Sequence, residues 1–426
     1  MRIVVAWLRG TVVALALAGE APAGTTPCAE RPYGEARLTP AQSGPARLAG
    51  VHKASFVAAE LDDRPVPQVS PDGAAYFTVR HRLGLQFGPE PAGSPPQVVG
   101  LPEVVEVGYG GAAPMPFAWQ ADSRAVFGAS QPRMYPRGGW ALGGWQPLRI
   151  WRDGRVERLP RLSHPSGELD SLQWAGGRGL ALAQFGTRGG LYRPERKNPE
   201  PAFAFIDAVR GRVLATFRFD RIPGVRPRRD GSDYALFRPA AAVVVRPDGR
   251  LRAVVQVARG PWVILDQGRP PRLAPIPGGP AAAGGVALSA DGRRVLITPS
   301  LQASGMICER NPNCPKPTPV EGSFAALYDL ETGERLWELR ATVTDFWTYP
   351  VPALNADGSL ALVGLPEDAA DAWPRVGLVS TRIGAVVQTL CAADSSSNVL
   401  AFLPNARMSL SGVGHVALYE VAGRGR

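Results

Sequence analysis

Arginine, tyrosine and tryptophan gather in segments that interrupt an otherwise apolar, strand-like pattern. Guanidinium groups pair with carboxylates and other anions, and these three side-chain types are the ones that most often anchor protein interfaces. The sequence therefore predicts binding of a protein or of an anionic envelope polymer through these segments. The candidate binding residues are Arg133, Tyr135, Arg137, Trp140, Trp145, Arg193, Arg196, Arg228 and Arg229.

Each of these segments also has a structural interpretation that stays open. The stretch from Gln131 to Trp145 can equally fold its own aromatic rings onto the body of the protein. The basic runs Arg188–Lys197 and Arg226–Arg229 have the composition of ordinary solvated loops.

Four cysteines suggest disulfides rather than a metal site. Cys308 and Cys314 enclose a short loop rich in Pro and Asn that a disulfide could staple, which would leave Cys28 and Cys391 as a long-range pair. Three connectivities are formally allowed. Because there is no Cys-x-x-Cys pair and the chain has only four histidines, we expect no metal ion and no cofactor.

A recurring acidic or polar turn indicates the elements that must position these residues. Asp and Gly tolerate the positive φ of a tight hairpin, and short β-branched or apolar runs flank each turn. A second hairpin follows in most units, so each unit has four antiparallel strands. The clearest turns are Ser70–Gly73, Gln120–Ser123, Arg246–Gly249, Ser289–Gly292 and Asn355–Gly358, with weaker copies at Trp174–Gly177 and Leu403–Ala406.

These repeats predict an all-β, seven-bladed β-propeller of four-stranded antiparallel blades. A four-stranded sheet with two apolar faces cannot bury both alone, so the copies must pack around an axis. The last unit has room for only three strands, and we expect the segment from Ala46 to Ala59 to supply the fourth and to close the ring. Six or eight blades stay open as alternatives, because units three and seven have degenerate turns.

Strand alternation also predicts where the long insertions lie. The first and third connections of each blade emerge on one face, and both are tight. All of the long insertions belong to the other two classes of connection and should crowd the opposite face, where binding usually resides. These insertions are Ala129–Pro147, Thr187–Pro201, Asp220–Pro239, Pro299–Ser323 and Leu365–Pro374.

The turns carry a resemblance to a known group of proteins. The Ser-Pro-Asp-Gly turns and the Asp329–Gly333 hairpin, Asp-x-x-Thr-Gly, resemble those of the WD40-like, YVTN-like and quinoprotein-like bacterial β-propellers, over nearly the whole chain. The Trp-Asp dipeptide of true WD40 repeats is missing. The resemblance implies a scaffold and says little about function.

The resemblance also supplies an alternative, a propeller enzyme with an axial site. Thr332–Trp337 resembles the blade-docking repeat of quinoprotein dehydrogenases, but the chain lacks the adjacent Cys pair that stacks on the quinone. A metal-dependent lactonase-like site would require carboxylates that converge on the axis, and the candidates are Asp170, Asp207, Asp329 and Glu420. No Gly-x-Ser-x-Gly elbow supports a serine hydrolase.

The amino terminus and the charge indicate the compartment. Arg2 and Arg9 precede an apolar run and two Ala-x-Ala sites, which is typical of a secretory signal peptide. We expect a signal peptide at 1–23, a lead-in segment at 24–45 and a single β-propeller domain at 46–426, in an extracytoplasmic, periplasmic or secreted monomer. The formal net charge of +10, nearly all from arginine, favours anionic partners. We expect no nucleic-acid partner and no membrane span.

Overall fold

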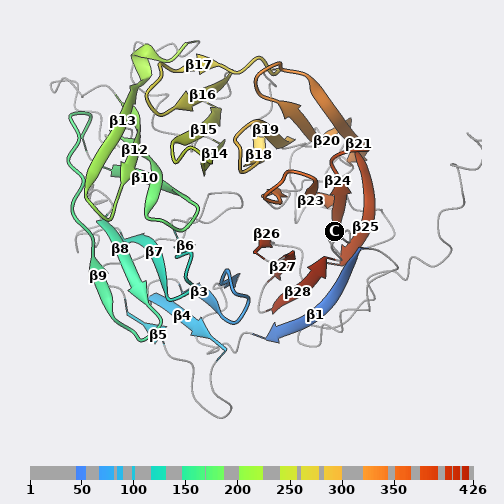
Figure 1. Cartoon of the computed structure of the whole chain (residues 1–426), viewed down its shortest axis with the longest axis horizontal. Helices are drawn as coiled ribbons and strands as arrows, with labels where there is room; N and C mark the ends of the chain where they lie inside the picture. Colours follow the sequence, from blue (N-terminus) through green and yellow to red (C-terminus); the bar gives the residue numbers. More distant parts are fainter. Residues whose placement is uncertain are drawn as a thin grey trace, which may run out of the picture.

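The chain forms a ring of antiparallel β-sheets around a central axis, shown down that axis in Figure 1. The computed structural model describes residues 45–53, 67–80, 84–89, 98–100, 117–130, 146–167, 169–186, 201–223, 240–256, 261–277, 283–299, 320–343, 351–365, 375–391, 399–404, 406–412 and 415–421. Within these ranges no helix has the length and apolar character needed to cross a membrane. The one helical element described is a short 3-10 turn, η1 (Phe219–Arg221).

Seven four-stranded sheets make up the ring, and we call them blades I to VII in chain order, each running from an inner to an outer strand. Blade I consists of β2 (Gln68–Val69), β3 (Tyr76–Arg80), β4 (Gly84–Gly88) and β5 (Val98–Val99). Blade II consists of β6 (Ala118–Trp119), β7 (Ala125–Ser130), β8 (Gln146–Trp151) and β9 (Val156–Arg158). Blade III consists of β10 (Leu169–Ala175), β11 (Leu180–Phe185), β12 (Ala202–Asp207) and β13 (Arg212–Arg218).

The remaining blades repeat this plan. Blade IV consists of β14 (Ala240–Val245), β15 (Leu251–Gln256), β16 (Trp262–Asp266) and β17 (Arg272–Leu273). Blade V consists of β18 (Ala283–Leu288), β19 (Arg294–Pro299), β20 (Val320–Asp329) and β21 (Arg335–Val343). Blade VI consists of β22 (Ala353–Leu354), β23 (Leu360–Leu365), β24 (Arg375–Ser380) and β25 (Ala385–Cys391). Blade VII consists of β26 (Val399–Leu403), β27 (Arg407–Gly412), β28 (His415–Val421) and β1 (Ala46–Lys53).

The first strand of the chain completes the last blade. β1 pairs antiparallel with β28, from Ala46 opposite Val421 to Lys53 opposite His415. The buried amide of Gln388, on the outer strand of blade VI, holds the backbone of Ala46 through both an acceptor at 2.8 Å and a donor at 3.0 Å. The predicted blade count and the predicted closure by the N-terminal strand are both confirmed.

The acidic turns close the two inner strands of most blades, as the sequence predicts. Gly249 and Gly292 adopt φ of 76° and 69°, a conformation that a Cβ atom disfavours. In blade II the same position is Ser123, with φ of 61°. The aspartate side chain folds back onto its own turn: Asp72 Oδ1 accepts the backbone N–H of Ala74 at 3.0 Å.

The hydrophobic core consists of seven clusters, one at each junction between neighbouring blades. The cluster between blades I and II contains Phe77 and Trp119, whose ring centroids lie 5.5 Å apart. Between blades II and III, Trp174 stacks on Phe127 at 5.3 Å. Because each blade buries both faces against neighbours, closing the ring leaves no blade with an open apolar side. Both tryptophans thus pack between blades.

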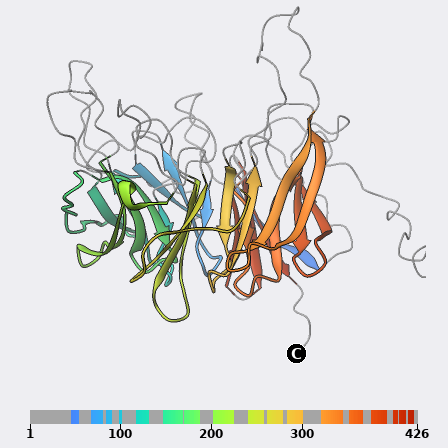
Figure 2. The ribbon, with the colours of Figure 1, turned by 90° about the horizontal axis from the view of Figure 1, so that it is seen from above.

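The two faces of the disc, seen from its edge in Figure 2, carry different kinds of connection between strands. The turn face carries the connections between first and second strands and between third and fourth strands, such as Arg246–Arg250 and Gln267–Pro271 in blade IV. The insertion face is the opposite edge, where pairs such as Ser130 with Gln146, Phe185 with Ala202, and Leu365 with Arg375 lie at the strand ends. The described strand ends that flank the five insertions all belong to the insertion face.

Candidate functional site

The residues predicted to bind a partner lie outside the described part of the chain. Arg133, Tyr135, Arg137, Trp140, Trp145, Arg193, Arg196, Arg228 and Arg229 all belong to insertions that start and end on the insertion face. Of the cysteines, Cys28, Cys308 and Cys314 also lie outside the described residues. Cys391 ends β25, with only its backbone described. On the insertion face, the structure therefore describes the roots of the insertions, by which we mean the strand ends where the insertions start and end.

Buried polar contacts hold the root of the insertion between β7 and β8. Gln146, which follows this insertion, is 8% exposed, and its Nε2 donates to the carbonyl oxygens of Leu159 at 2.7 Å and Pro147 at 3.2 Å. Its Oε1 accepts a hydrogen bond from Arg161 at 3.2 Å. The contacts with Leu159 and Arg161 tie the end of the insertion to the segment that links blades II and III.

The two insertions of blade III begin on packed aromatic residues. Phe185, at the end of β11, is fully buried and stacks on the ring of His164 at a centroid distance of 4.5 Å. Phe219, which opens η1, is buried against Phe203 at 4.8 Å, and its N–H donates to Pro201 O at 2.9 Å. The chain therefore leaves the disc on blades II and III from rigid positions.

His164 closes a small clasp between blades II and III. Its Nδ1 accepts the backbone N–H of Ser166 at 3.1 Å, which leaves Nε2 to donate to Thr216 Oγ1 at 3.1 Å. Burial lowers the pKa of this imidazole below its usual value of 6.5, because the charged form loses solvation. The contacts and the burial together favour the neutral ring.

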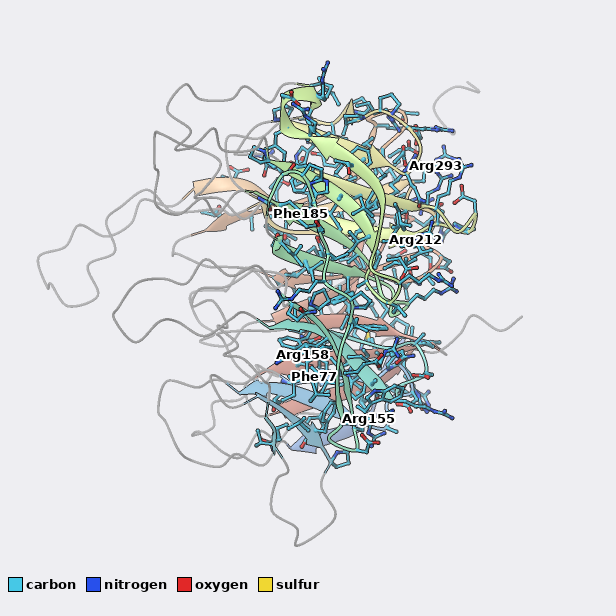
Figure 3. All side chains as sticks on the ribbon, turned by 90° about the vertical axis from the view of Figure 1, so that its left-hand side faces the viewer. Phe77, Arg155, Arg158, Phe185, Arg212 and Arg293 are labelled. Carbon is cyan, nitrogen blue, oxygen red and sulfur yellow. The ribbon has the colours of Figure 1, made fainter. Side chains whose placement is uncertain are left out.

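The turn face carries a recurring Asp-x-Arg sequence that projects arginines away from the disc. In blades II, IV and V the aspartate of the turn accepts the backbone N–H of the arginine two residues later: Asp122 with Arg124 at 3.1 Å, Asp153 with Arg155 at 3.0 Å, Asp248 with Arg250 at 3.1 Å, and Asp291 with Arg293 at 2.9 Å. One oxygen of each carboxylate is thereby bound to its own turn. Figure 3 shows Arg155, Arg212 and Arg293 on the same side of the disc.

Positive charge on the turn face is concentrated in blades II to IV. Arginines outnumber carboxylates there about two to one, whereas the described turns of blades V, VI, VII and I have more carboxylates than arginines. The arginines at the turn face of blades II to IV are Arg124, Arg152, Arg155, Arg178, Arg210, Arg212, Arg246, Arg250, Arg252, Arg269 and Arg272, and the carboxylates are Asp122, Asp153, Asp207, Asp248 and Asp266.

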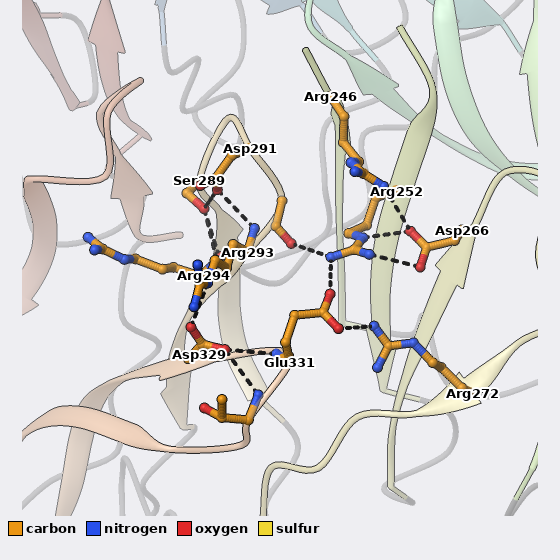
Figure 4. A network of polar contacts seen from close by, with 12 residues as sticks. Arg246, Arg252, Asp266, Arg272, Ser289, Asp291, Arg293, Arg294, Asp329 and Glu331 are labelled. Atoms are coloured by element: carbon orange, nitrogen blue, oxygen red, sulfur yellow. Dashed lines mark hydrogen bonds and ion pairs between the residues drawn. The ribbon is translucent and has the colours of Figure 1, made fainter. Parts of the chain in front are cut away.

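One arginine of this set, Arg252, is buried in a polar network between blades IV and V (Figure 4). It binds Asp266 with two parallel hydrogen bonds of 2.5 and 2.9 Å, and its third nitrogen donates to Gly292 O at 3.0 Å and Glu331 Oε1 at 2.8 Å. The other oxygen of Glu331 accepts from Arg272 at 2.9 Å. Burial alone would lower the pKa of Arg252, but the hydrogen bonds and charges of Asp266 and Glu331 outweigh it and raise the pKa.

A second charge pair lies beside this network in blade V. Arg293 binds Asp329 at 2.8 Å, and Asp329 also accepts the backbone N–H groups of Glu331 and Thr332. Desolvation would raise the pKa of Asp329, but these hydrogen bonds and the charge of Arg293 outweigh it and lower the pKa. The Asp-x-x-Thr-Gly hairpin is thus a structural turn whose aspartate binds one arginine and two backbone N–H groups.

Three of the four carboxylates considered for an axial site lie on the third strands of their blades rather than on the inner strands. Asp207, Asp329 and Glu420 lie on β12, β20 and β28, the third strands of their blades, and each lies beside an arginine of the turn face: Arg210 at 2.8 Å, Arg293 at 2.8 Å and Arg407 at 3.5 Å. Asp170 lies on the inner strand β10, with its side chain outside the described set. In the described part of the chain, no group of three or more His, Cys, Asp or Glu could hold a metal ion.

Sequence reasoning overlooked the turn-face arginines and the Arg252 network. The Asp-x-Arg spacing in the turns was the available signal for the first. For the second, Arg252 stands out as a cation within the strand Leu251–Gln256, which is buried throughout.

Comparison with known proteins identifies the fold and nothing finer. No protein-family model matches the sequence, and no curated protein matches it. Among solved structures, the chain is similar to the WD40 β-propeller domain of Doa1, with a TM-score of 0.51 and 12% sequence identity over 88% of this chain and 97% of that one. At this identity the likeness concerns the fold alone. Together with the seven-bladed ring, it shows that the chain has a β-propeller fold.

Proposed function

We propose that this protein is an exported binding platform whose insertion face recognises a protein partner. The observation that carries the proposal is the asymmetry of the disc: the turn face has short, hydrogen-bonded turns, whereas the five long insertions are all flanked by strand ends of the insertion face. Long loops on a rigid scaffold commonly hold binding residues, and propellers commonly serve as interaction platforms.

The roots of the insertions support this proposal. The buried amide of Gln146 and the packed rings of Phe185 and Phe219 fix the points where the chain leaves blades II and III. Such anchoring lowers the ordering cost of a loop on binding, because its ends are already placed. The candidate anchors in the insertion between β7 and β8 are Arg133, Tyr135, Arg137, Trp140 and Trp145. Export is supported by the leader-like segment 1–23.

A matched pair of deletions tests this proposal. Replacing 132–145 by a short Gly-Ser linker removes the arginine and aromatic residues between the described ends, and replacing 367–373 removes an insertion of the same face that has a single aromatic residue. The partner is first captured from envelope extracts on the wild-type protein, then purified and titrated by calorimetry. We expect the first deletion to abolish binding and the second to preserve it. Equal affinity of the two variants would overturn the assignment of that insertion as the binding element.

A further inference from the structure

The described face of the disc offers a second surface of defined chemistry. Six exposed arginines of blades II to IV have no described carboxylate within ion-pair distance, although aspartates lie close to them in sequence. Asp122, Asp153 and Asp248 each accept a backbone N–H of their own turn, and Asp248 also lies 3.6 Å from the guanidinium group of Arg246. The unpaired arginines are Arg124, Arg152, Arg155, Arg178, Arg212 and Arg250.

The same face is different in blades V to VII. There, Arg293 pairs with Asp329 at 2.8 Å, Arg335 with Glu338 at 2.9 Å, and Arg407 approaches Glu420 at 3.5 Å. The excess of arginines over carboxylates in the turns of blades II to IV therefore gives that half of the face a net positive field.

The turns of blades II and III bring three of the arginines into one neighbourhood. The backbone N–H of Ala121 donates to Gly177 O at 3.1 Å, and that of Arg152 donates to Arg124 O at 3.2 Å. The turns that carry Arg124, Arg152 and Arg178 are therefore contiguous. Beside them, the guanidinium group of Arg155 lies over the ring of Trp151, 4.3 Å from its centroid. Stacking on an aromatic ring restricts a guanidinium group and leaves its N–H edges free to donate.

We propose that the turn face of blades II to IV, centred on Arg124, Arg152, Arg155 and Arg178, binds an extended acidic peptide segment of a partner protein. Guanidinium groups match carboxylates through paired, charge-assisted hydrogen bonds, so glutamate and aspartate side chains are the ligands that suit this surface. The inference depends on the proposed platform role but concerns the face opposite to the insertions.

The distribution of negative charge favours a narrow peptide over a broad anionic surface. Asp122, Asp153 and Asp248 are exposed between the arginines and are held there by their turns. A membrane or a dense polyanion would bring its own negative charges against all three aspartates, and like charges in contact repel each other. A peptide in extended conformation places side chains alternately, so it can meet the arginines and avoid the aspartates.

The experiment measures binding of a fluorescein-labelled (Glu-Ser)6 peptide to the full chain by anisotropy at low and physiological salt. The test variant is Arg124→Gln/Arg155→Gln/Arg178→Gln. The matched control is Arg335→Gln/Arg382→Gln/Arg407→Gln, which removes the same charge from the same face outside the proposed surface. We expect the test variant to bind at least about tenfold more weakly and the control to stay within about twofold of wild type. Because the three test arginines are exposed, both variants should unfold at the wild-type temperature; the single change Arg178→Glu provides a second, smaller perturbation.

Several outcomes would overturn the proposal. Equal weakening in both triple variants would mean that net charge alone attracts the peptide. Sedimentation with phosphatidylglycerol vesicles through the same arginines, without peptide binding, would assign the surface to a membrane instead. Absence of peptide binding by the wild type at low salt would remove the surface altogether. Failure here is distinguishable from failure of the proposed function, because the 132–145 replacement should leave peptide affinity unchanged.

Discussion

Replacing Arg252 by methionine should destabilise the ring more than any other loss of one of its described ion pairs. The Arg252 and Asp266 side chains are 5% and 4% exposed, so removing the cation leaves a buried carboxylate that keeps only the more distant Arg246, at 4.0 Å, as an ion-pair partner. Breaking a buried pair in this way costs about 3–5 kcal/mol. The change also removes the donor to Gly292 O in the turn of the neighbouring blade and one of the two cations bound by Glu331. We therefore expect a loss of unfolding free energy of about 4 kcal/mol.

Equilibrium unfolding in urea, followed by tryptophan fluorescence, measures this loss. The matched control is Arg272→Met, which removes the other arginine bound to Glu331 from a side chain that is 37% exposed, and it should cost no more than about 1 kcal/mol. The double variant Arg252→Met/Asp266→Leu should recover most of the loss, because it removes the stranded charge. Equal destabilisation by Arg252→Met and Arg272→Met would refute the idea that burial makes this network costly to break.

Three further predictions concern a tryptophan between blades, the glycines of two turns, and His164. Trp119→Ala should lower the free energy of unfolding in urea by about 3–5 kcal/mol, since the 7% exposed ring packs on Phe77 and its Nε1 donates to Gln68 O at 2.9 Å. Trp119→Phe should cost clearly less. Equal costs of the two changes would contradict a packing role. Gly333→Ala should destabilise the protein more than Gly249→Ala. Both glycines have φ of 76°, a conformation that costs about 1–2 kcal/mol for a residue with a Cβ atom. Of the two, only Gly333 lies where the new Cβ would collide with Pro275 O. The pKa of His164 is lowered in the folded protein, so the unfolded chain binds a proton first as the pH falls below about 6.5. The contribution of His164 to the free energy of unfolding is therefore complete above that pH and is lost as the pH falls toward the pKa of the folded state. His164→Asn should flatten the dependence of the urea midpoint between pH 7.5 and 5.5, and an unchanged slope would exclude this histidine as a contributor.

Local sequence signals were sufficient for the architecture. The Asp-Gly turns require positive φ, and Gly73, Gly249, Gly292 and Gly358 adopt it at the predicted positions. The shortage of one strand in the last repeat correctly predicted that the segment starting at Ala46 would pair with β28. Such features depend on conformational preferences within a few residues and on a repeat count, which a single sequence contains.

Contacts between blades were less accessible to sequence reasoning. Arg252 and Glu331 are separated by 79 positions, and the packing of blade IV against blade V brings them together. Likewise, whether an arginine of a turn is paired depends on the neighbouring hairpin. Arg293 pairs with Asp329 of the next hairpin in its blade, whereas Arg124 has no described carboxylate partner. The predicted binding residues of the insertions stay predictions, because they lie outside the described residues.

The central claim is that this ring recognises partners through chemically distinct sectors of its two faces. Hydrogen–deuterium exchange of the full chain, with and without the (Glu-Ser)6 peptide, tests it most directly. We predict slower exchange in the turns 121–124, 152–155, 176–179 and 248–250, with no change in the turns of blades V to VII. Protection that is spread evenly around the turn face, or confined to blades V to VII, would contradict the account.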